Sequence, residues 1–270
     1  MSPTVILMRH AQGYHNLGIR HHHLVDPALT PTGEQQCRGR AGELADQQPS
    51  ISLVAASPLT RTLQTAMLVF ERALALPTCA DAIVALPTAQ ESFDYPFNTG
   101  SDIGALRDSC AQKGWPVDLS LVEDGWTDRS LKSPYFPAGT RLAERARRTR
   151  LWLKEKLQEL VQTGLEDATI ALVTHGNFLH FLTDDWEAAT KYHGTGWKNC
   201  EYRSYSFEPS SLASGNDEAR LVETERSRRR RGLSTPPPSM EEQKRLFYET
   251  IAAWHLQGLP DAFELDSMLV

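Results

Sequence analysis

The sequence predicts an α/β fold: a three-layer α/β/α sandwich around a mostly parallel central sheet, with a small cap insertion. Two observations lead to this prediction. Short aliphatic, β-branched runs alternate with segments of helical spacing, as in chains of βαβ units. The chain also has 270 residues, 40% of them apolar and 23% charged, which is enough to bury one large core.

The predicted strands are short apolar runs bounded by turn residues. The run at 169–174 is the clearest, because it is continuous and is followed at once by the start of a helix. The last two runs are shorter and are expected at an edge of the sheet. The strands are expected at residues 4–8, 51–55, 83–86, 169–174, 204–207 and 221–224.

The predicted helices have apolar residues three and four positions apart. Thr30 or Thr32 is the expected N-cap of the first helix, with Pro31 in its first turn. Gly164 ends the longest helix. The helices are expected at about 32–47, 60–75, 140–161 and 240–256, and directly after residue 175.

The domain organisation follows from where this alternation stops. Residues 1–207 form the main domain, and about 92–138 read as an irregular insertion within it. Residues 208–239 are rich in Ser, Gly and Pro and are expected to be a loop and linker, before a helical tail at 240–270. The insertion holds four aromatic residues that form either a substrate lid or a small core of its own: Trp115, Trp126, Tyr135 and Phe136.

Composition excludes several classes of protein. The net charge of −6 favours neither nucleic acid nor an anionic membrane as a partner, so any phosphate site must concentrate positive charge locally. The only apolar run near the amino-terminal end, at 5–8, is too short for a signal peptide, and no run is long enough for a membrane span, so we expect a cytoplasmic protein. The cysteines form no CxxC pair and suggest neither a zinc ribbon nor disulfides: Cys37, Cys79, Cys110 and Cys200.

Two histidines and two arginines follow predicted strands. Arg9 and His10 come directly after the first strand, Arg61 follows the second, and His175 follows the strand at 169–174. Because the carboxyl ends of strands in an open α/β sheet meet at one crevice, we expect these side chains to converge. A neutral imidazole is a nucleophile at phosphorus, and guanidinium groups match phosphate oxygens. The free N–H groups of the helix after His175 would add positive potential.

Four segments in order resemble the histidine phosphatase superfamily, in its phosphoglycerate mutase-like branch. They span roughly residues 4 to 185, and the tail beyond about 205 is similar to that of fungal members of the family. The segments are Leu7-Met-Arg-His-Ala-Gln-Gly-Tyr-His-Asn16, Asp26-Pro-Ala-Leu-Thr-Pro-Thr-Gly-Glu-Gln35, Ser57-Pro-Leu-Thr-Arg-Thr-Leu-Gln-Thr-Ala66 and Thr174-His-Gly176.

The resemblance implies roles for five residues. His10 matches the nucleophile that becomes phosphorylated, and Arg9 and Arg61 match the phosphate clamps. His175 matches the second histidine of the pocket, and Asn16 matches a polar residue that lines the phosphate site.

The resemblance also implies a proton donor after the third strand. Glu91 is similar in position to that residue, and Asp94 or Asp102 could substitute for it. The function implied is a metal-independent phosphatase that hydrolyses a small phosphate monoester through a phosphohistidine, without a cofactor. Two alternatives stay open: a phosphomutase, and a family member repurposed for binding or for non-phosphatase chemistry in a biosynthetic pathway.

Some positions depart from the family pattern. Ala11 stands where the family most often has Gly, which is unfavourable if that position requires positive φ. The tryptophan-containing segment of the mutases is missing, which favours a phosphatase, and His21–His23 stand in that stretch. Gln12-Gly-Tyr14 and the few cysteines disfavour the acid phosphatase and phytase branch.

Two further features have a possible function and a plainer explanation. His21–His23 could bind a metal, but consecutive side chains alternate in direction, so a loop near the cleft mouth is preferred. The run at 228–231 could attract a phosphorylated partner or nucleic acid, but a solvated loop is preferred. The expected partner is a small phosphorylated substrate. The sequence does not predict the oligomeric state.

Overall fold

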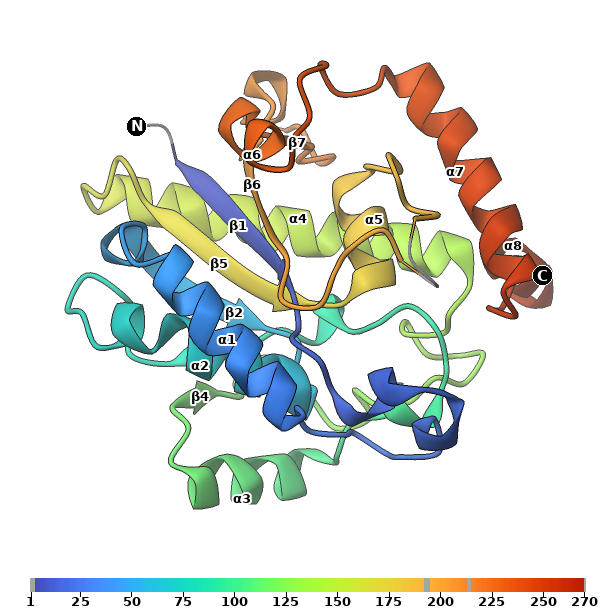
Figure 1. The fold of residues 1–270 in the computed structure, drawn as a ribbon, viewed down its shortest axis with the longest axis horizontal. Coiled ribbons are helices and arrows are strands. Elements are labelled where there is room, and N and C mark those ends of the chain that lie inside the picture. Colours follow the sequence, from blue (N-terminus) through green and yellow to red (C-terminus); the bar gives the residue numbers. More distant parts are fainter. Residues whose placement is uncertain (1–2, 192–194, 213–214, 270) are drawn as a thin grey trace.

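One seven-stranded sheet forms the centre of the computed structural model, which describes residues 3–191, 195–212 and 215–269 (Figure 1). The strand order is β4-β3-β2-β5-β1-β6-β7, and the strands from β4 to β1 are parallel. Strand β6 is antiparallel to β1, and β7 is antiparallel to β6. The strands are β1 (Thr4–Arg9), β2 (Ile51–Ala56), β3 (Ile83–Ala85), β4 (Val117–Asp118), β5 (Thr169–Thr174), β6 (Tyr202–Phe207) and β7 (Leu221–Glu223).

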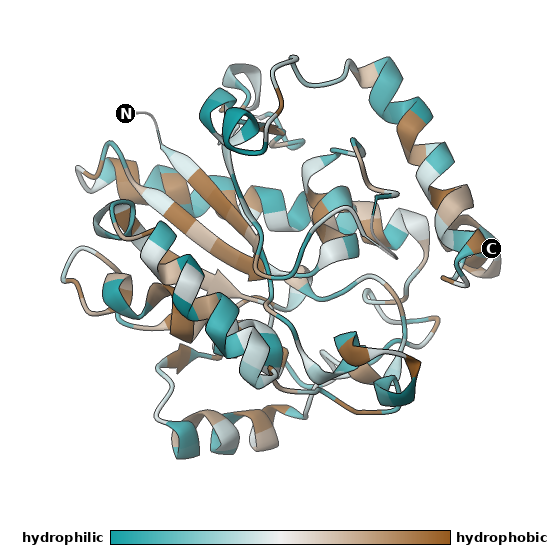
Figure 2. Ribbon diagram, in the orientation of Figure 1, coloured by the Kyte–Doolittle hydropathy of each residue, from teal (hydrophilic) through white to brown (hydrophobic). Residues whose placement is uncertain are grey.

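Helices cover both faces of this sheet, which confirms the predicted α/β/α sandwich. Alternate residues of β1 point to opposite faces: Ile6 and Met8 pack in a cluster with α1 and α2, whereas Val5 and Leu7 pack in another with α4 and α5. Figure 2 shows hydrophobic residues concentrated in the central strands and mixed with hydrophilic ones in the helices. The helices are α1 (Pro31–Glu43), α2 (Thr60–Leu74), α3 (Ile103–Lys113), α4 (Gly139–Gln162), α5 (Gly176–Thr183), α6 (Glu225–Arg230), α7 (Met240–Leu256) and α8 (Ala262–Asp266).

Helix α1 begins as its capping residues predict. The Thr30 hydroxyl accepts a hydrogen bond from the Gly33 amide at 3.0 Å, and Pro31 occupies the first turn. Of the two expected N-caps, Thr30 is therefore the one used. The start of this helix fixes the loop that returns from the end of β1, because the Thr30 amide donates to the Gln12 carbonyl.

The insertion at about 92–138 is more regular than predicted. It contains α3 and the two-residue strand β4, which pairs in parallel with β3 and extends the sheet. The prediction of an irregular insertion is therefore wrong for the part that contains α3 and β4. Trp126 is 2% exposed and Phe136 is 8% exposed, so these two aromatic side chains are buried and do not form a lid. Trp126 packs in the core cluster that contains α1 and α2, not in a separate core of the insertion.

The segment at 208–239 also differs from the predicted loop and linker, because it contains α6, which the sequence does not predict. Strand β7 forms where the short strand at 221–224 is expected. Arg228 is 4% exposed and forms an ion pair with Glu187 at 2.8 Å, and Arg231 pairs with Glu223. Arg228 and Arg231 are therefore paired with other parts of the chain, and the prediction that the run at 228–231 is a solvated loop is wrong.

The helical tail packs on its own domain. Ile251 and Trp254 of α7 join the core cluster that contains α4 and α5, and the Tyr95 hydroxyl reaches the carbonyl of Gly258 at 3.4 Å. Figure 1 shows α7 and α8 along one side of the molecule. Within the described ranges, no helix combines the length and apolar character needed to cross a membrane.

Candidate active site

His10 and His175 lie side by side because they follow two neighbouring parallel strands. Arg9 pairs with Thr174 at the end of the β1–β5 register, and the His10 amide donates to the Thr174 carbonyl at 2.9 Å. The centres of the two imidazole rings are 5.3 Å apart. His10 is 1% exposed and His175 is fully buried. The sheet therefore brings together two histidines from opposite ends of the domain.

The hydrogen bonds of His10 decide which of its nitrogens can act as a nucleophile. Nδ1 lies 2.7 Å from the carbonyl oxygen of Ala11. A carbonyl oxygen only accepts hydrogen bonds, so Nδ1 carries the proton and Nε2 keeps its lone pair in the neutral ring. Burial, together with the charges of Arg61 and Arg9, holds the pKa of His10 well below its usual value. The ring is therefore neutral at physiological pH.

Ala11 fits its position without backbone strain. Its φ is not positive, so the position does not require Gly and the alanine is not strained there. Its amide donates to the Thr65 hydroxyl at 3.1 Å, and its side chain is fully buried. The departure from Gly therefore leaves the turn after β1 intact.

Arg61 lies in the first turn of α2 and points to the same place. Its Nη1 donates to the Phe97 carbonyl at 2.6 Å, and its Nη2 donates to Asn98 Oδ1 at 2.8 Å and to His175 Nδ1 at 3.2 Å. Burial lowers the pKa of Arg61 to about 10, and the nearby Asp26 carboxylate opposes that shift. Arg61 therefore remains a buried cation in contact with the second histidine.

His175 is held by two polar neighbours. Because an arginine can only donate, His175 Nδ1 accepts from Arg61, and Nε2–H is left to donate to the Ser57 hydroxyl at 2.9 Å. Burial is the main reason that the pKa of His175 lies well below its usual value. The imidazole is therefore neutral and fixed in one tautomer, at the N-cap position of α5.

Arg9 directly precedes His10, and Asn16 is connected to the His10 carbonyl through Asn199. Arg9 Nη1 donates to the Trp197 carbonyl at 2.5 Å, whereas its buried Nε has no partner in the described chain. The side-chain oxygen of Asn16 accepts from the Gly13 amide at 3.0 Å and from Asn199 Nδ2 at 3.2 Å. Asn16 therefore stabilises the loop that follows His10.

Glu91 is 8% exposed and lies against the start of α5. Its Oε1 accepts from the amides of Ser92 at 2.9 Å and Phe178 at 3.0 Å. One of the helix N–H groups expected to face phosphate is therefore already taken by this carboxylate. Asp102 instead caps α3 at the surface, and Asp94 is exposed. The structure thus puts Glu91, and not these alternatives, in the buried region.

Two buried arginines hold the main chain around Glu91, and sequence reasoning missed both. Arg129 Nη1 donates to the Glu91 carbonyl at 3.1 Å, and its Nη2 donates to Gln90 Oε1 at 3.0 Å. Arg145 Nη2 donates to the carbonyls of Gln90 and Glu91 at 3.0 and 3.1 Å. The Arg145 guanidinium also lies over the Phe178 ring, 4.6 Å from its centre. These contacts fix where the Glu91 side chain begins.

Both arginines stay charged although they are buried. Burial lowers the pKa of Arg129 to about 10 and that of Arg145 to about 9. A signal for Arg145 exists in the sequence, because it shares the buried face of α4 with Leu142, Ala146 and Leu153. Arg129 has no such signal, since it lies in the insertion, where no periodicity indicates its direction.

A stack of rings leads from His10 to the surface. His15 is 6% exposed, its ring centre lies 5.4 Å from that of His10, and it stacks on Phe97 at 4.9 Å. Phe97 in turn stacks on Tyr95 at 5.0 Å, and His22 packs against Phe97 at 5.0 Å. The aromatic side chains beside the site therefore come from the first loop and from the start of the insertion.

The described residues give no geometry for a metal or a disulfide. No cluster of three or more His, Cys, Asp or Glu side chains that could hold a metal occurs in the described ranges. The four cysteines are buried and free: Cys37, Cys79, Cys110 and Cys200.

The comparisons with known proteins agree with this architecture. Residues 5–81 match the family model of the histidine phosphatase superfamily (branch 1). Among solved structures, an ecdysone phosphate phosphatase from Bombix mori, in complex with tungstate, aligns with a TM-score of 0.54 and 14% identity over 88% of this chain and 94% of that chain. A mycobacterial glucosyl-3-phosphoglycerate phosphatase aligns with a TM-score of 0.46 and 18% identity, over 82% of this chain and 96% of that one. No curated protein sequence matches the chain. The first alignment supports the fold.

Proposed function

We propose that the chain is a histidine phosphatase: a metal-independent phosphatase that acts on a small-molecule phosphate monoester, as the match of residues 5–81 to that superfamily (branch 1) supports. Its enzyme class, phosphoric monoester hydrolase, is the one that the family implies. The proposed route passes through a phosphohistidine at His10. The positive charge that neutralises the phosphoryl group comes from the arginines beside the two histidines.

In the first step, the Nε2 lone pair of His10 attacks phosphorus. A P–N bond forms while the P–O bond to the leaving group breaks in line. Arg9 and Arg61 neutralise the phosphoryl oxygens, and His175 and Asn16 contact the same group. Glu91 donates a proton to the leaving oxygen. That proton sits on Oε2, because Oε1 is occupied by two amide N–H groups.

In the second step, water attacks the phosphohistidine. The Glu91 carboxylate removes a proton from the water as its oxygen bonds to phosphorus, and the P–N bond breaks. Phosphate leaves, His10 returns to its neutral form, and Glu91 is protonated again. The cycle therefore balances with water as the only co-reactant.

The observation that carries this proposal is the tautomer of the neutral His10 ring. Its Nδ1–H is committed to the Ala11 carbonyl, so the neutral ring has one available lone pair, on Nε2. Two arginines supply charge beside it: after burial, Arg61 and Arg9 are the next causes that lower the pKa of His10. This combination matches the requirements of phosphoryl transfer to nitrogen.

The test is hydrolysis of p-nitrophenyl phosphate between pH 6 and 8, with EDTA present. His10→Gln should lower kcat/KM by about 10³-fold or more, because it removes the nucleophile. The matched control is His255→Gln, which changes an exposed histidine of α7. Activity that EDTA abolishes, or that survives in His10→Gln, would contradict the proposal.

Two further measurements separate the proposed hydrolase from the alternatives. Rapid quenching with substrate should give an acid-labile phosphoryl group on the peptide that contains His10. Release of inorganic phosphate in equal amount to the alcohol identifies a hydrolase, whereas return of the phosphoryl group to product identifies a mutase. Binding of phosphate without turnover would instead indicate a repurposed site.

A further inference from the structure

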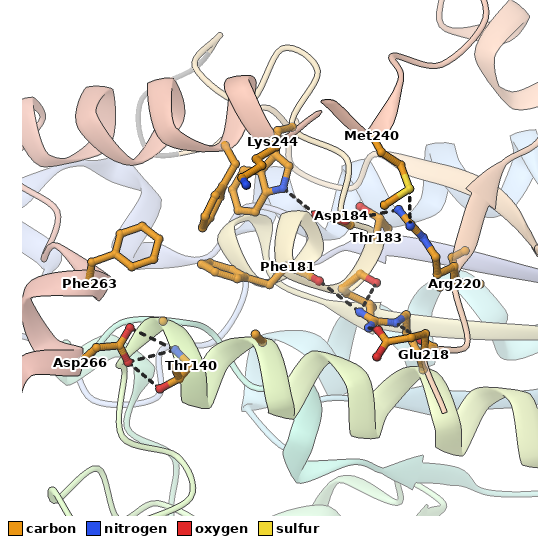
Figure 3. A pocket seen from close by; sticks show the side chains of 17 residues that line it. Thr140, Phe181, Thr183, Asp184, Glu218, Arg220, Met240, Lys244, Phe263 and Asp266 are labelled. Atoms are coloured by element: carbon orange, nitrogen blue, oxygen red, sulfur yellow. Dashed lines mark hydrogen bonds and ion pairs between the residues drawn. The ribbon is translucent and has the colours of Figure 1, made fainter. Parts of the chain in front are cut away.

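A cavity of about 700 Å³ lies between the carboxyl-terminal helices and the layer of α4 and α5 (Figure 3). Helix α4 contributes Ala143, the end of α5 contributes Phe181 to Asp184, and the tail contributes Lys244 and Phe263. No residue proposed for phosphoryl transfer lines this space. Its volume lies within the roughly 300–1,000 Å³ typical of small-molecule sites.

The walls of the cavity are largely aromatic. Trp186 and Phe247 are 4.6 Å apart between ring centres, Phe247 and Phe263 are 5.3 Å apart, and Phe181 and Trp186 are 5.2 Å apart. Figure 3 shows the rings of Phe181 and Phe263 facing one another across the space. Phe263 is 39% exposed, so water reaches part of this apolar surface. A flat apolar molecule would displace that water favourably.

One positively charged side chain at the cavity has no partner within the described ranges. Six charged side chains line the space, and Lys244 of α7 is the one that forms no hydrogen bond or ion pair within the described ranges. The other five have partners already: Arg150, Asp184, Glu218, Arg220 and Asp266. Because the acids are occupied by groups of the chain itself, the remaining electrostatic preference is for an anion.

We propose that this cavity binds a flat, apolar small molecule that carries one acidic group, of the aromatic carboxylate or sulfonate class. The four rings contact the body of the ligand, and Lys244 binds its acid. The site is separate from the phosphatase site, since it adjoins the carboxyl-terminal end of α5 whereas His175 lies at the other end of that helix.

The first test uses anilinonaphthalene sulfonate, an aromatic monoanion whose fluorescence rises in apolar sites. Ala143→Trp fills the cavity from an exposed position of α4, so it should weaken binding about tenfold or more without disturbing the core. The control is Ala111→Trp, at an exposed position of α3. Excitation of tryptophan should transfer energy to the bound probe, since Trp186 lines the cavity.

The second test separates charge from apolar contact. Lys244→Met should weaken anilinonaphthalene sulfonate binding about fivefold and leave binding of the uncharged phenylnaphthylamine within about twofold. Lys132→Met, an exposed change in the insertion, should alter neither. Phosphatase activity and the far-ultraviolet circular dichroism of every variant should match wild type.

Three results would overturn the proposal. The first is equal binding of the sulfonate by wild type and Ala143→Trp. The second is equal loss of both probes in Lys244→Met. The third is a dimer that excludes the probe as protein concentration rises, which would assign the cavity to an interface between copies of the chain.

Discussion

Four buried histidines should make the folded chain sensitive to mild acid. They are His10, His15, His175 and His180, and His15, the most accessible of them, is 6% exposed. Burial is the main cause that lowers the pKa of each, in the case of His180 to about 4. In the unfolded chain a histidine has a pKa of about 6.5. Below that pH, the unfolded chain binds protons that the folded chain does not.

The free energy of unfolding should therefore fall as the pH falls through 6.5. Between pH 7.5 and 5.5 each buried histidine accounts for a loss of about 1.4 kcal/mol, and the four together for about 5–6 kcal/mol. The total stability of a domain is about 5–15 kcal/mol, so this loss is a large share of it. Asp26, whose pKa is raised by burial, has the opposite effect at lower pH, where carboxyl groups titrate.

The assay is urea unfolding followed by tryptophan fluorescence at the two pH values. His180→Gln should reduce the pH-dependent loss by about 1.4 kcal/mol, because one of the four titrating groups is gone. His255→Gln, which changes an exposed histidine, should leave the loss unchanged. Free energies of unfolding that agree within about 1 kcal/mol at pH 7.5 and 5.5 would refute the reasoning.

Three further substitutions test the site and the core. Arg145→Met should lower kcat/KM about 10–100-fold, because the main chain of Glu91, the proposed proton donor, loses a hydrogen-bond donor. The Tm should stay within a few degrees, since a buried charge is also removed, and Arg148→Met, at an exposed position of α4, is the control. Asn98→Ala should raise KM for phosphate esters and cost about 1–3 kcal/mol in urea unfolding, because Arg61 loses one of its two side-chain acceptors; an unchanged KM would argue against this support. Leu153→Ala should cost about 2–5 kcal/mol in the same assay, since the side chain is fully buried in the core, and a loss below about 1 kcal/mol would contradict that packing.

The parts of the site that follow strands could be predicted from the sequence. The placement of His10 and His175 requires only that two short apolar runs form parallel strands, because each histidine comes directly after its strand. Arg61 follows the same logic, at the start of α2 after β2. The core strands and α7 are likewise local patterns of apolar residues, and the structure confirms them.

The parts that depend on contacts between distant segments could not be predicted. Arg129 and Asn98 reach the site through the path of the insertion, and no local pattern encodes that path. Strand β4 has two residues, too few for any periodicity, and exists because β3 offers it an edge. The sequence places Arg228 in a charge run that is expected to be solvated. In the structure it is buried, and Glu187 from a distant segment pairs with it.

The position of β1 in the sheet sets when during synthesis the site can exist. A ribosome releases β1 first, but its two neighbours are β5 and β6, which come from the second half of the domain. His10 therefore emerges from the ribosome long before β5, the strand that His175 follows. Pairing at such sequence separation also slows folding. The proposed phosphate site therefore stays incomplete in the nascent chain until β5 and β6, which end at residue 207, have been synthesised, so any activity of that site arises late in synthesis.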